Sequence, residues 1–435
     1  MSAPALDCIT AARTGRPLGE AAITGLIADY LDGSVPDYQL AAWLMAVACN
    51  GLAVEDTVTL TRVLAATGQQ LNLRDLAPFV ADKHSTGGIG DNTTLVLVPL
   101  LAAVGIPVGK LTGRSLGHHG GTVDKLESIS GLHLPADAAE FTKSLAATGI
   151  GLTGQSDHLA PGDGALYALR DVTGTVDSIP LIASSIMSKK LAAGTSACVL
   201  DVKTGPGAVL TDPTATLELA RLMVDIGNRA GLPTRAVISD MSQPLGHAIG
   251  NTLEVAEAVH ALSGRHVPGL TDLTLALAQL IAAQAWPDHT ADRIRHRLHT
   301  ALADGSALAA LRRWVEHLGG DVRQIDDPAL LPAADVRLAV PAPASGVVHR
   351  IDGDELGRIA AELGAGRARA DSPIDPAVGI QLHRRVGDPV RADEPVAELH
   401  LRTTHDQAAL LQRTAAAFTV ADGPATAPPL IHHTI

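Results

Sequence analysis

Aromatic residues, cysteine and lysine are scarce in this sequence, and each shortage excludes a class of protein. Phe, Trp and Tyr make up 2% of the 435 residues, and the formal net charge is -13. A nucleic-acid surface needs a basic stripe and stacking rings, so we expect no nucleic-acid partner. The three cysteines, Cys8, Cys49 and Cys198, show no metal-ligand spacing and indicate no disulfide framework, which favours a cytoplasmic location.

Long apolar runs are missing as well. The apolar stretch 95–108 is too short to span a bilayer and contains Gly105 and two prolines. The segment around Asp7 lacks the long apolar core of a signal peptide, so we expect no membrane association. Apolar residues nonetheless make up 46% of the chain, which is enough for two or three folded domains with a sizeable core.

Lysine occurs seven times, and all seven residues lie between Lys83 and Lys203, whereas arginine is spread along the whole chain. A sequence that uses arginine wherever a cation is needed retains lysine where a compact ammonium group is required. Chance retention in a compositionally biased genome is the alternative. The lysines stand in Gly-rich and Ser-rich segments, however, and such segments are suited to holding an anion.

Two glycine-rich loops follow predicted strands and precede predicted helices. Residues 83–91 read Lys-His-Ser-Thr-Gly-Gly-Ile-Gly-Asp, and residues 112–122 read Thr-Gly-Arg-Ser-Leu-Gly-His-His-Gly-Gly-Thr. Two successive strand–loop–helix units indicate an α/β domain. Glycines let backbone amides approach an anion, and a helix N-terminus favours negative charge. Both loops are therefore predicted phosphate cradles.

Histidines stand in both loops, and the two settings suggest different chemistry. His84 lies between two hydrogen-bond donors, where a bound phosphate dianion would favour imidazolium and allow general-acid catalysis. Alternatively, His84 has a structural role and forms hydrogen bonds with its neighbours. Its place in a glycine loop favours the catalytic role. The pair His118–His119 suggests zinc, but no cysteine or spaced His/Asp cluster accompanies it.

Polar and basic residues share a face of a later predicted helix. Ser185 and Lys189 are four residues apart, so both side chains lie on the same side. Tyr167 and Arg170 are three residues apart on the preceding helix. Arg170, Ser185 and Lys189 could together bind the oxygens and nitrogen of a small planar heterocycle. A surface ion pair of Arg170 with the adjacent aspartate is the alternative.

These segments together resemble the thymidine and pyrimidine-nucleoside phosphorylases. The similarity is carried by residues 83–94, 113–131, 166–180 and 185–194, and it extends to Asp-Met-Ser-Gln-Pro-Leu-Gly at 240–246. The resemblance implies that phosphate attacks C1′ of a pyrimidine nucleoside with inversion, giving free base and an α-pentose 1-phosphate. It also implies an oxocarbenium-like transition state, a homodimer, and phosphate as co-substrate with no organic cofactor.

The implied fold is α/β, with a small all-helical domain, a large α/β domain and a C-terminal α/β cap. The expected extents are 1–68 with about 160–193 for the helical domain, 75–155 with 197–330 for the large domain, and 335–435 for the cap. The proline-rich break near 331–343 supports the last boundary. The active site would lie in the cleft between the first two domains. We expect the tail from Gly423 to be loosely held.

The resemblance assigns roles residue by residue. The residues implied to hold phosphate are Lys83, Ser85, Thr94, Lys110, Thr112 and Thr122. The residues implied to bind the nucleoside are Leu116, Tyr167, Arg170, Ser185 and Lys189. Of these, Arg170, Ser185 and Lys189 would stabilise negative charge that develops on the base. His84 would donate a proton to a base oxygen, and domain closure would bring the two reactants together.

Two further features follow from the bacterial pyrimidine-nucleoside type. Members of this type hold a potassium ion, and the matching positions are Gly90, Asn92, Leu245, Ala248 and Glu257. They also have lysine at the position of Lys110, where thymidine-restricted members have methionine. Because lysine tolerates a ribose 2′-hydroxyl, we expect uridine, thymidine and deoxyuridine as substrates, with a thymidine-restricted enzyme as the alternative.

The second loop departs from the family pattern. Ser115 replaces a usual glycine, His119 a usual threonine and Thr112 a usual serine, while the presumed chemical groups are all present. Ser115 and His119 could reshape the sugar pocket for a modified uridine, for example one altered at its 5′ position. Two different functions also stay open, namely an anthranilate-type phosphoribosyltransferase, which would require magnesium, and a non-catalytic nucleoside-binding protein.

Overall fold

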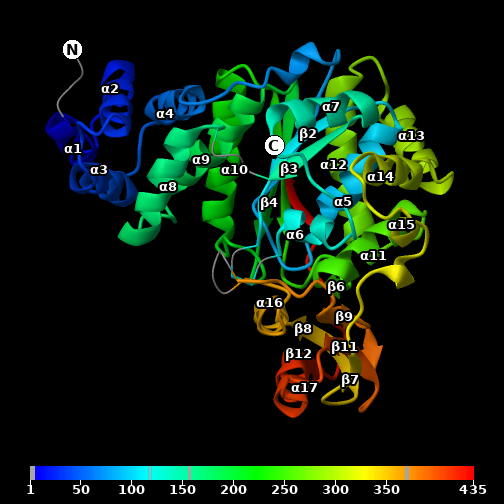
Figure 1. Cartoon of the computed structure of the whole chain (residues 1–435). Helices are drawn as coiled ribbons and strands as arrows, with labels where there is room; N and C mark the ends of the chain where they lie inside the picture. Colours follow the sequence, from blue (N-terminus) through cyan, green and yellow to red (C-terminus); the bar gives the residue numbers. More distant parts are fainter. Residues whose placement is uncertain (1–4, 116, 119, 155–157, 368–371) are drawn as a thin grey trace.

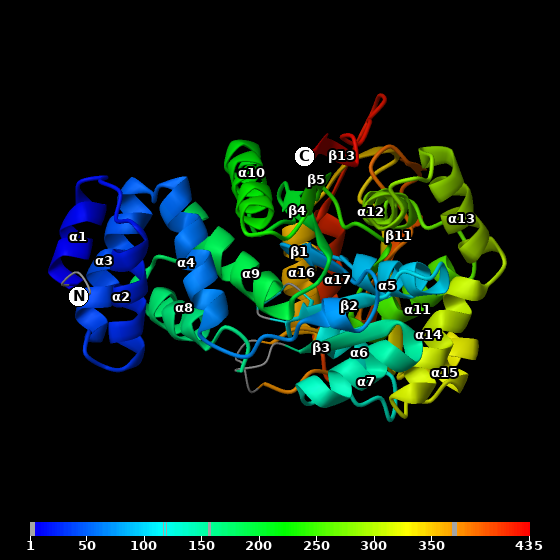
Figure 2. The same ribbon diagram turned by 90° about the horizontal axis from the view of Figure 1, so that it is seen from above.

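The computed structural model describes residues 5–115, 117–118, 120–154, 158–367 and 372–435. A group of helices forms one end of the molecule, at the left of Figures 1 and 2. It contains α1 (Ala5–Arg13), α2 (Glu20–Leu31), α3 (Asp37–Asn50), α4 (Val54–Ala66), α8 (Pro161–Thr173) and α9 (Ile179–Ala193). Trp43 of α3 is fully buried among them, and Leu166 and Leu181 bring α8 and α9 into the same core. Segments separated by about a hundred residues thus share one apolar cluster.

A mostly parallel sheet forms the centre of the large domain, with the strand order β13-β5-β4-β1-β2-β3. Its strands are β1 (Ala81–Ser85), β2 (Val108–Thr112), β3 (Ile150–Gly154), β4 (Ala197–Thr204), β5 (Thr234–Asp240) and β13 (Ile431–Thr434). All neighbours in β5-β4-β1-β2-β3 are parallel, and β4 is buried along its whole length. Parallel sheets of this kind are covered by helices on both faces.

Helices cover the sheet on both sides in Figure 1, with α10 on one side and α5 and α12 on the other. The large domain also contains short 3-10 turns at Leu73–Asp75 and Pro328–Leu330. Its helices are α5 (Thr93–Ala103), α6 (Thr122–Glu127), α7 (Ala138–Thr148), α10 (Pro213–Arg229), α11 (Asn251–Leu262), α12 (Leu270–Ala285), α13 (Ala291–Ala303), α14 (Ser306–His317) and α15 (Arg323–Asp326). Residues 93–101 of α5 are all buried, because α11, α12 and α14 pack around it. The two predicted strand–loop–helix units are β1–α5 and β2–α6.

The C-terminal cap lies below the large domain in Figure 1 and contains two small antiparallel sheets. The orders are β6-β9-β11-β7 and β10-β8-β12. The elements are β6 (Ala248–Ile249), β7 (Val336–Pro341), β8 (Gly346–Ile351), α16 (Gly353–Glu362), β9 (Gly379–Leu382), β10 (Pro389–Val390), β11 (Pro395–Leu401), α17 (Gln407–Ala416) and β12 (Phe418–Ala421). The predicted fold class, with a helical domain, an α/β domain and a C-terminal cap, is confirmed.

The prediction of a loosely held C-terminal tail is wrong for its last residues. Strand β13 pairs antiparallel with β5, and Ile435 exchanges backbone hydrogen bonds of 2.8 and 3.0 Å with Ala236. The tail thereby covers an edge of the central sheet that would otherwise expose unpaired backbone groups. Within the described ranges, no helix is long and apolar enough to cross a membrane.

Candidate active site

The positions implied to hold phosphate meet at one edge of the central sheet. Parallel strands present their carboxyl ends together, and the helices that follow begin at the same edge. Neighbouring strands β1 and β2 and the first turns of α5 and α6 supply these residues, which are Lys83, Ser85, Lys110, Thr112, Thr94 and Thr122. The amide groups at the two helix N-termini favour a bound anion there.

Lys83 is fully buried and belongs to a network of opposite charges. Its Nζ donates to Thr93 Oγ1 at 2.6 Å and lies 3.5 Å from Asp201 Oδ2. Lys203 Nζ lies 2.7 Å from the same oxygen of Asp201. Burial lowers the pKa of Lys83, and the nearby carboxylates of Asp91 and Asp201 only partly offset that effect. The ammonium group therefore depends on its aspartate partners to stay charged.

Asp91 is a central member of this network that the sequence analysis did not identify. Its carboxylate accepts hydrogen bonds from Ser85 Oγ and from Thr93 Oγ1, the latter at 2.6 Å. Burial raises the pKa of Asp91, but Lys203 and Lys83 outweigh burial and hold that pKa well below its ordinary value. An acidic residue at the end of a glycine loop is the only sequence signal for it, and that signal does not show which donors it meets.

Lys110 lies on β2 beside Lys83. Its Nζ donates to the backbone carbonyl oxygen of Lys83 at 2.9 Å. Burial, followed by the charges of Lys190 and Lys83, lowers the pKa of Lys110 to about 7. A lysine poised near neutral pH becomes fully charged when an anion binds beside it.

His84 is half-buried on β1 and faces a region rich in ammonium groups. Burial lowers its pKa well below the ordinary value, and Lys190, Lys110, Lys83 and Lys189 lower it further. The imidazole is therefore neutral until an anion arrives. Three of these lysines come from β2 and α9, so their effect on His84 cannot be seen in the local sequence, which shows only that a bound dianion would favour imidazolium.

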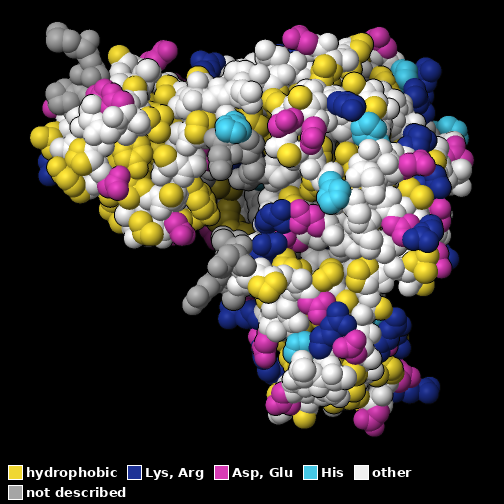
Figure 3. Space-filling view, in the orientation of Figure 1, with side chains coloured by type: hydrophobic (Ala, Val, Ile, Leu, Met, Phe, Trp, Pro, Cys, Tyr) yellow, Lys and Arg dark blue, Asp and Glu magenta, His cyan; other side chains and the backbone are white. Residues whose placement is uncertain are grey.

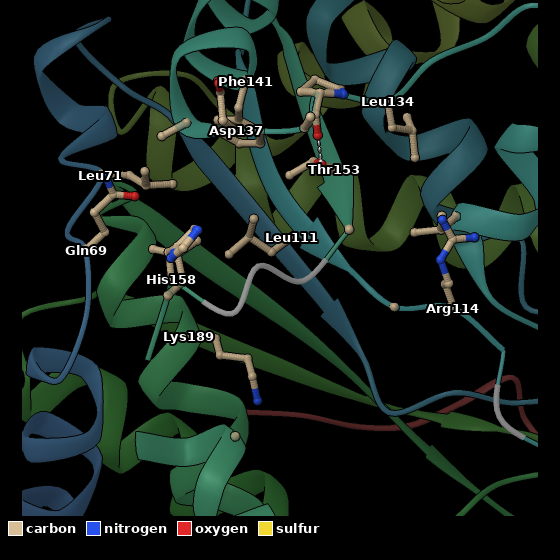
Figure 4. Close-up of a pocket in the computed structure, with 18 of the residues that line it drawn as sticks. Gln69, Leu71, Leu111, Arg114, Leu134, Asp137, Phe141, Thr153, His158 and Lys189 are labelled. Atoms are coloured by element: carbon tan, nitrogen blue, oxygen red, sulfur yellow. Dashed lines mark hydrogen bonds between the residues drawn. The ribbon is translucent and has the colours of Figure 1, made fainter. Parts of the chain in front are cut away.

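A cavity of about 1370 Å³ opens between the helical and large domains (Figure 4). Four of the predicted site residues line it, namely His84, Tyr167, Ser185 and Lys189. Leu111 and Arg114 line it from the large domain. The figure shows Lys189 on α9 extending towards this space, with Leu111 and Arg114 beyond it. The fold thus brings together residues about one hundred positions apart in the sequence.

Asp163 organises the part of the site on α8 and α9, and the sequence analysis missed it. Its Oδ2 accepts from Ser185 Oγ at 2.9 Å and pairs with Lys189 Nζ. Asp163 precedes Tyr167 by four residues, so both lie on one face of α8. That spacing was a usable signal. One buried carboxylate therefore holds both side chains of α9 that are implied to bind the base.

Arg170 is placed differently from these residues. Its guanidinium donates to the backbone carbonyl oxygens of Thr175, Val176 and Leu181 at 3.3, 2.7 and 3.1 Å. It also lies 5.6 Å from the ring centroid of Tyr167. Arg170 is therefore 2% exposed and supports the α8–α9 connection in this structure. Its role in binding a base stays a prediction.

The second glycine loop contacts the cap through ion pairs. His118 Nε2 lies 2.7 Å from Asp354 Oδ1, and Arg367 Nη2 lies 2.7 Å from Asp124 Oδ1. Asp124 also accepts from the backbone N–H of Ser115 at 2.6 Å. The hydroxyl group of Ser115 is buried and finds no hydrogen-bond partner among the described residues. Leu116 and His119, two positions named from the sequence, lie outside the described residues.

Four of the five positions matched to potassium ligands converge behind the first loop. Glu257 Oε2 accepts from Asn92 Nδ2 at 3.0 Å. A Cβ placed on Gly90 would lie 3.0 Å from the carbonyl oxygen of Ala248, so these two backbones are close. Asn92 Oδ1 is buried with no hydrogen-bond partner among the described residues. An unused amide oxygen, a carboxylate and a carbonyl fit a hard monovalent cation.

The fifth position, Leu245, also lies beside Gly90, because a Cβ placed on Gly90 would lie 3.6 Å from the backbone nitrogen of Leu245. Its carbonyl oxygen accepts from Arg385 Nη1 at 3.1 Å, and the carbonyl oxygen of Gly246 accepts from the same nitrogen at 2.9 Å. A carbonyl oxygen has two lone pairs, so Leu245 can accept from Arg385 and still bind a cation. The residues present fit a cation at Gly90, Asn92, Leu245, Ala248 and Glu257.

Comparisons with known proteins agree along nearly the whole chain. Residues 6–68 match the glycosyl transferase family, helical bundle domain, and residues 77–308 match the glycosyl transferase family, a/b domain. Residues 347–421 match the pyrimidine nucleoside phosphorylase C-terminal domain.

Individual relatives extend the match. The chain is 47% identical over 395 residues to the pyrimidine-nucleoside phosphorylase of Bacillus subtilis strain 168, covering 91% of each chain. It is 43% identical over 430 residues to the pyrimidine-nucleoside phosphorylase of Staphylococcus aureus strain USA300, covering 99% of each. The crystal structure of anthranilate phosphoribosyltransferase from Thermus thermophilus matches with a TM-score of 0.59 at 19% identity. That match covers 72% of this chain and 99% of the other, and it shows a shared fold alone.

Proposed function

The chain belongs to the pyrimidine-nucleoside phosphorylase family, and we propose that it catalyses the reversible phosphorolysis of uridine, thymidine and deoxyuridine. One observation carries the proposal beyond the family name. His84, on the strand that bears Lys83 and Ser85, lines the same cavity between domains as Ser185 and Lys189. A phosphate at the strand ends and a base on α8 and α9 would therefore meet beside one imidazole.

The geometry supports separate roles for the individual site residues during the reaction. Phosphate oxygen attacks C1′ while the bond to the base nitrogen breaks, and the electron pair of that bond moves onto the base. The ammonium group of Lys189 stabilises the charge that develops there, and Ser185, whose proton is used by Asp163, offers the base an acceptor. Phosphate binding raises the pKa of His84 by adding negative charge beside it, which allows His84 to donate a proton to a base oxygen. Asp163 keeps Ser185 and Lys189 in place throughout.

The direct test is release of free base from the three nucleosides with and without phosphate. We expect release from all three, dependent on phosphate and independent of added magnesium. Release from thymidine alone would overturn the proposed substrate range. A requirement for magnesium would favour a phosphoribosyltransferase, and nucleoside binding without turnover would favour a non-catalytic protein.

The wild type should lose phosphate affinity as the pH rises through the neutral range, and Lys110→Met should not show this loss. The free enzyme loses the Lys110 ammonium as the pH rises through about 7, so kcat/KM for phosphate should fall there. In Lys110→Met, kcat/KM for phosphate should be lower throughout and should show no fall near neutral pH. Lys110→Arg is charged at every pH, so it should keep its phosphate affinity into the alkaline range. Profiles of kcat/KM for phosphate in the three proteins measure this effect. If kcat/KM for phosphate still falls near neutral pH in Lys110→Met, a group other than Lys110 causes the fall.

Potassium binding at Gly90, Asn92, Leu245, Ala248 and Glu257 is part of the proposal. The cation would use the free oxygen of Asn92 and offset the buried charge of Glu257. We expect potassium chloride to raise the melting temperature more than sodium chloride at equal ionic strength. Glu257→Gln should abolish that difference between the two salts.

A cytoplasmic homodimer completes the proposal. Leu6 on α1 and Tyr38 and Met45 on α3 are exposed, and Figure 3 shows hydrophobic side chains gathered over this end of the molecule. Tyr38 and Met45 are seven residues apart and share a helix face, which suits a second copy of the chain. Sedimentation should give a dimer, and Tyr38→Arg should shift it towards monomer. The free thiols Cys8, Cys49 and Cys198 suit a reducing compartment.

A further inference from the structure

The hydroxyl group of Ser85 is oriented by a carboxylate inside the first glycine loop. Ser85 Oγ donates to Asp91 Oδ2 at 2.5 Å, and the backbone N–H of Gly87 donates to Ser85 Oγ at 3.2 Å. A serine hydroxyl has one proton and two lone pairs. The proton is used by Asp91 and one lone pair by Gly87. Ser85 therefore presents an acceptor, and no donor, to a ligand.

Asp91 is itself held in this orientation. Its Oδ1 accepts from the backbone N–H and from Oγ1 of Thr93 at 3.2 and 2.6 Å. Thr93 Oγ1 accepts from Lys83 Nζ at 2.6 Å, so the threonine proton is free to point at Asp91. Both carboxylate oxygens are committed, and releasing Ser85 by rotating Asp91 would break the bonds to Thr93.

Net charge in this cluster does not determine which anion binds. Lys203 Nζ lies 2.7 Å from Asp201 Oδ2 and 3.8 Å from Asp91 Oδ2, and Lys83 Nζ lies 3.5 Å from Asp201 Oδ2. The positive charges of the two ammonium groups and the negative charges of the two carboxylates sum to zero. The pattern of donors and acceptors at Ser85 is therefore the feature that can distinguish anions of equal size and charge.

We propose that Ser85, oriented by Asp91, accepts the P–OH hydrogen of monoprotonated phosphate and so selects it over dianions that carry no proton. The inference rests on the proposed function, since it takes Ser85 to be a phosphate ligand. The proton stays on the phosphoryl group, because a different phosphate oxygen attacks C1′. Asp91 is a positioning residue that acts through Ser85.

Sulfate and monofluorophosphate are suitable probes, because both are dianions of similar size without a proton at neutral pH. Each must either face a lone pair of Ser85 or break the Ser85–Asp91 bond. A hydrogen bond to a charged group corresponds to about ten- to hundredfold in affinity. We expect both ions to inhibit with constants weaker than the phosphate KM by that factor. Arsenate, which carries a proton, should replace phosphate as co-substrate.

Asp91→Asn tests the role of the carboxylate. Thr93 donates twice to Oδ1, so the asparagine amide nitrogen must face Ser85 and donate to it. Ser85 can then donate to a proton-free anion, and the sulfate to phosphate selectivity should collapse by about tenfold or more. Asp201→Asn is the matched control, because it removes the same charge from the same lysines without touching Ser85.

The results of these experiments distinguish a failure of the inference from a failure of the proposed function. Loss of selectivity in Asp91→Asn alone supports the inference. Equal loss of selectivity in Asp91→Asn and Asp201→Asn overturns the inference. An Asp91→Asn enzyme that is active and keeps its selectivity also overturns it. If Asp91→Asn does not fold, the wild-type constants decide, because proton-free dianions that bind as tightly as phosphate contradict the inference. Absence of phosphate-dependent turnover in the wild type would instead contradict the proposed function.

Discussion

Replacing His84 with asparagine should lower kcat for uridine phosphorolysis by about 10²- to 10⁴-fold, the usual contribution of a general acid. Asparagine has a similar shape and still donates a hydrogen bond, but it cannot transfer a proton. The leaving base would then depart as an anion stabilised by the ammonium group of Lys189. Single-turnover release of base, measured at saturating phosphate, isolates the chemical step.

Two comparisons sharpen this test. His133→Asn changes another histidine that lines the cavity and should leave kcat nearly unchanged. A nucleoside of 5-fluorouracil should lose less in His84→Asn, because the fluorine makes the base a better leaving group that needs less protonation. An equal loss on both nucleosides would show that His84 does not protonate the base and acts by positioning.

The second large effect concerns stability. Lys125→Met should destabilise the fold by about 3–5 kcal/mol, the usual cost of leaving one partner of a buried ion pair alone. Lys125 Nζ lies 2.5 Å from Glu254 Oε2 and donates to the carbonyl oxygen of Asp91 at 2.8 Å. The side chains of Lys125 and Glu254 are 2% and 3% exposed. The variant leaves a carboxylate in the interior without its cation.

The pH dependence of this loss has a definite sign. Burial already raises the pKa of Glu254 above 4.5, although Lys125 opposes the shift, and removing Lys125 raises it further. A raised folded-state pKa means that the folded state binds the proton more tightly than the unfolded state. The stability of the variant therefore falls as the pH rises from 4.5 towards the raised pKa. The deficit should be smaller in acid than at neutral pH.

Denaturant midpoints of the wild type and two variants measure this prediction. Lys143→Met makes the same substitution at an exposed lysine of α7 and should change stability by no more than about 0.5 kcal/mol. A similar small change in Lys125→Met would mean that water reaches Glu254. That result would also weaken the view that the scarce lysines serve buried carboxylates.

The lysine distribution shows what local sequence can predict. The Gly-rich and Ser-rich segments around Lys83, Lys110 and Lys189 predict an anion site, and these lysines lie on neighbouring strands or on α9 beside the cavity. Lys125 lies on α6, directly after the second loop, yet its ion pair with Glu254 joins residues far apart in the chain. No spacing rule predicts that pairing, since α6 and α11 meet only in the folded protein.

By itself, the sequence determined the α/β class and the two strand–loop–helix units, because glycine spacing and apolar periodicity are local properties, and the resemblance of its motifs indicated the family. Only the tertiary structure decided that Asp91 orients Ser85, that Asp163 holds Ser185 and Lys189, and that β13 completes the central sheet. It also placed His84 among lysines, and burial and these charges lower the pKa of the imidazole. Burial and charges brought in from other elements set these properties, and neither can be read from neighbours along the chain.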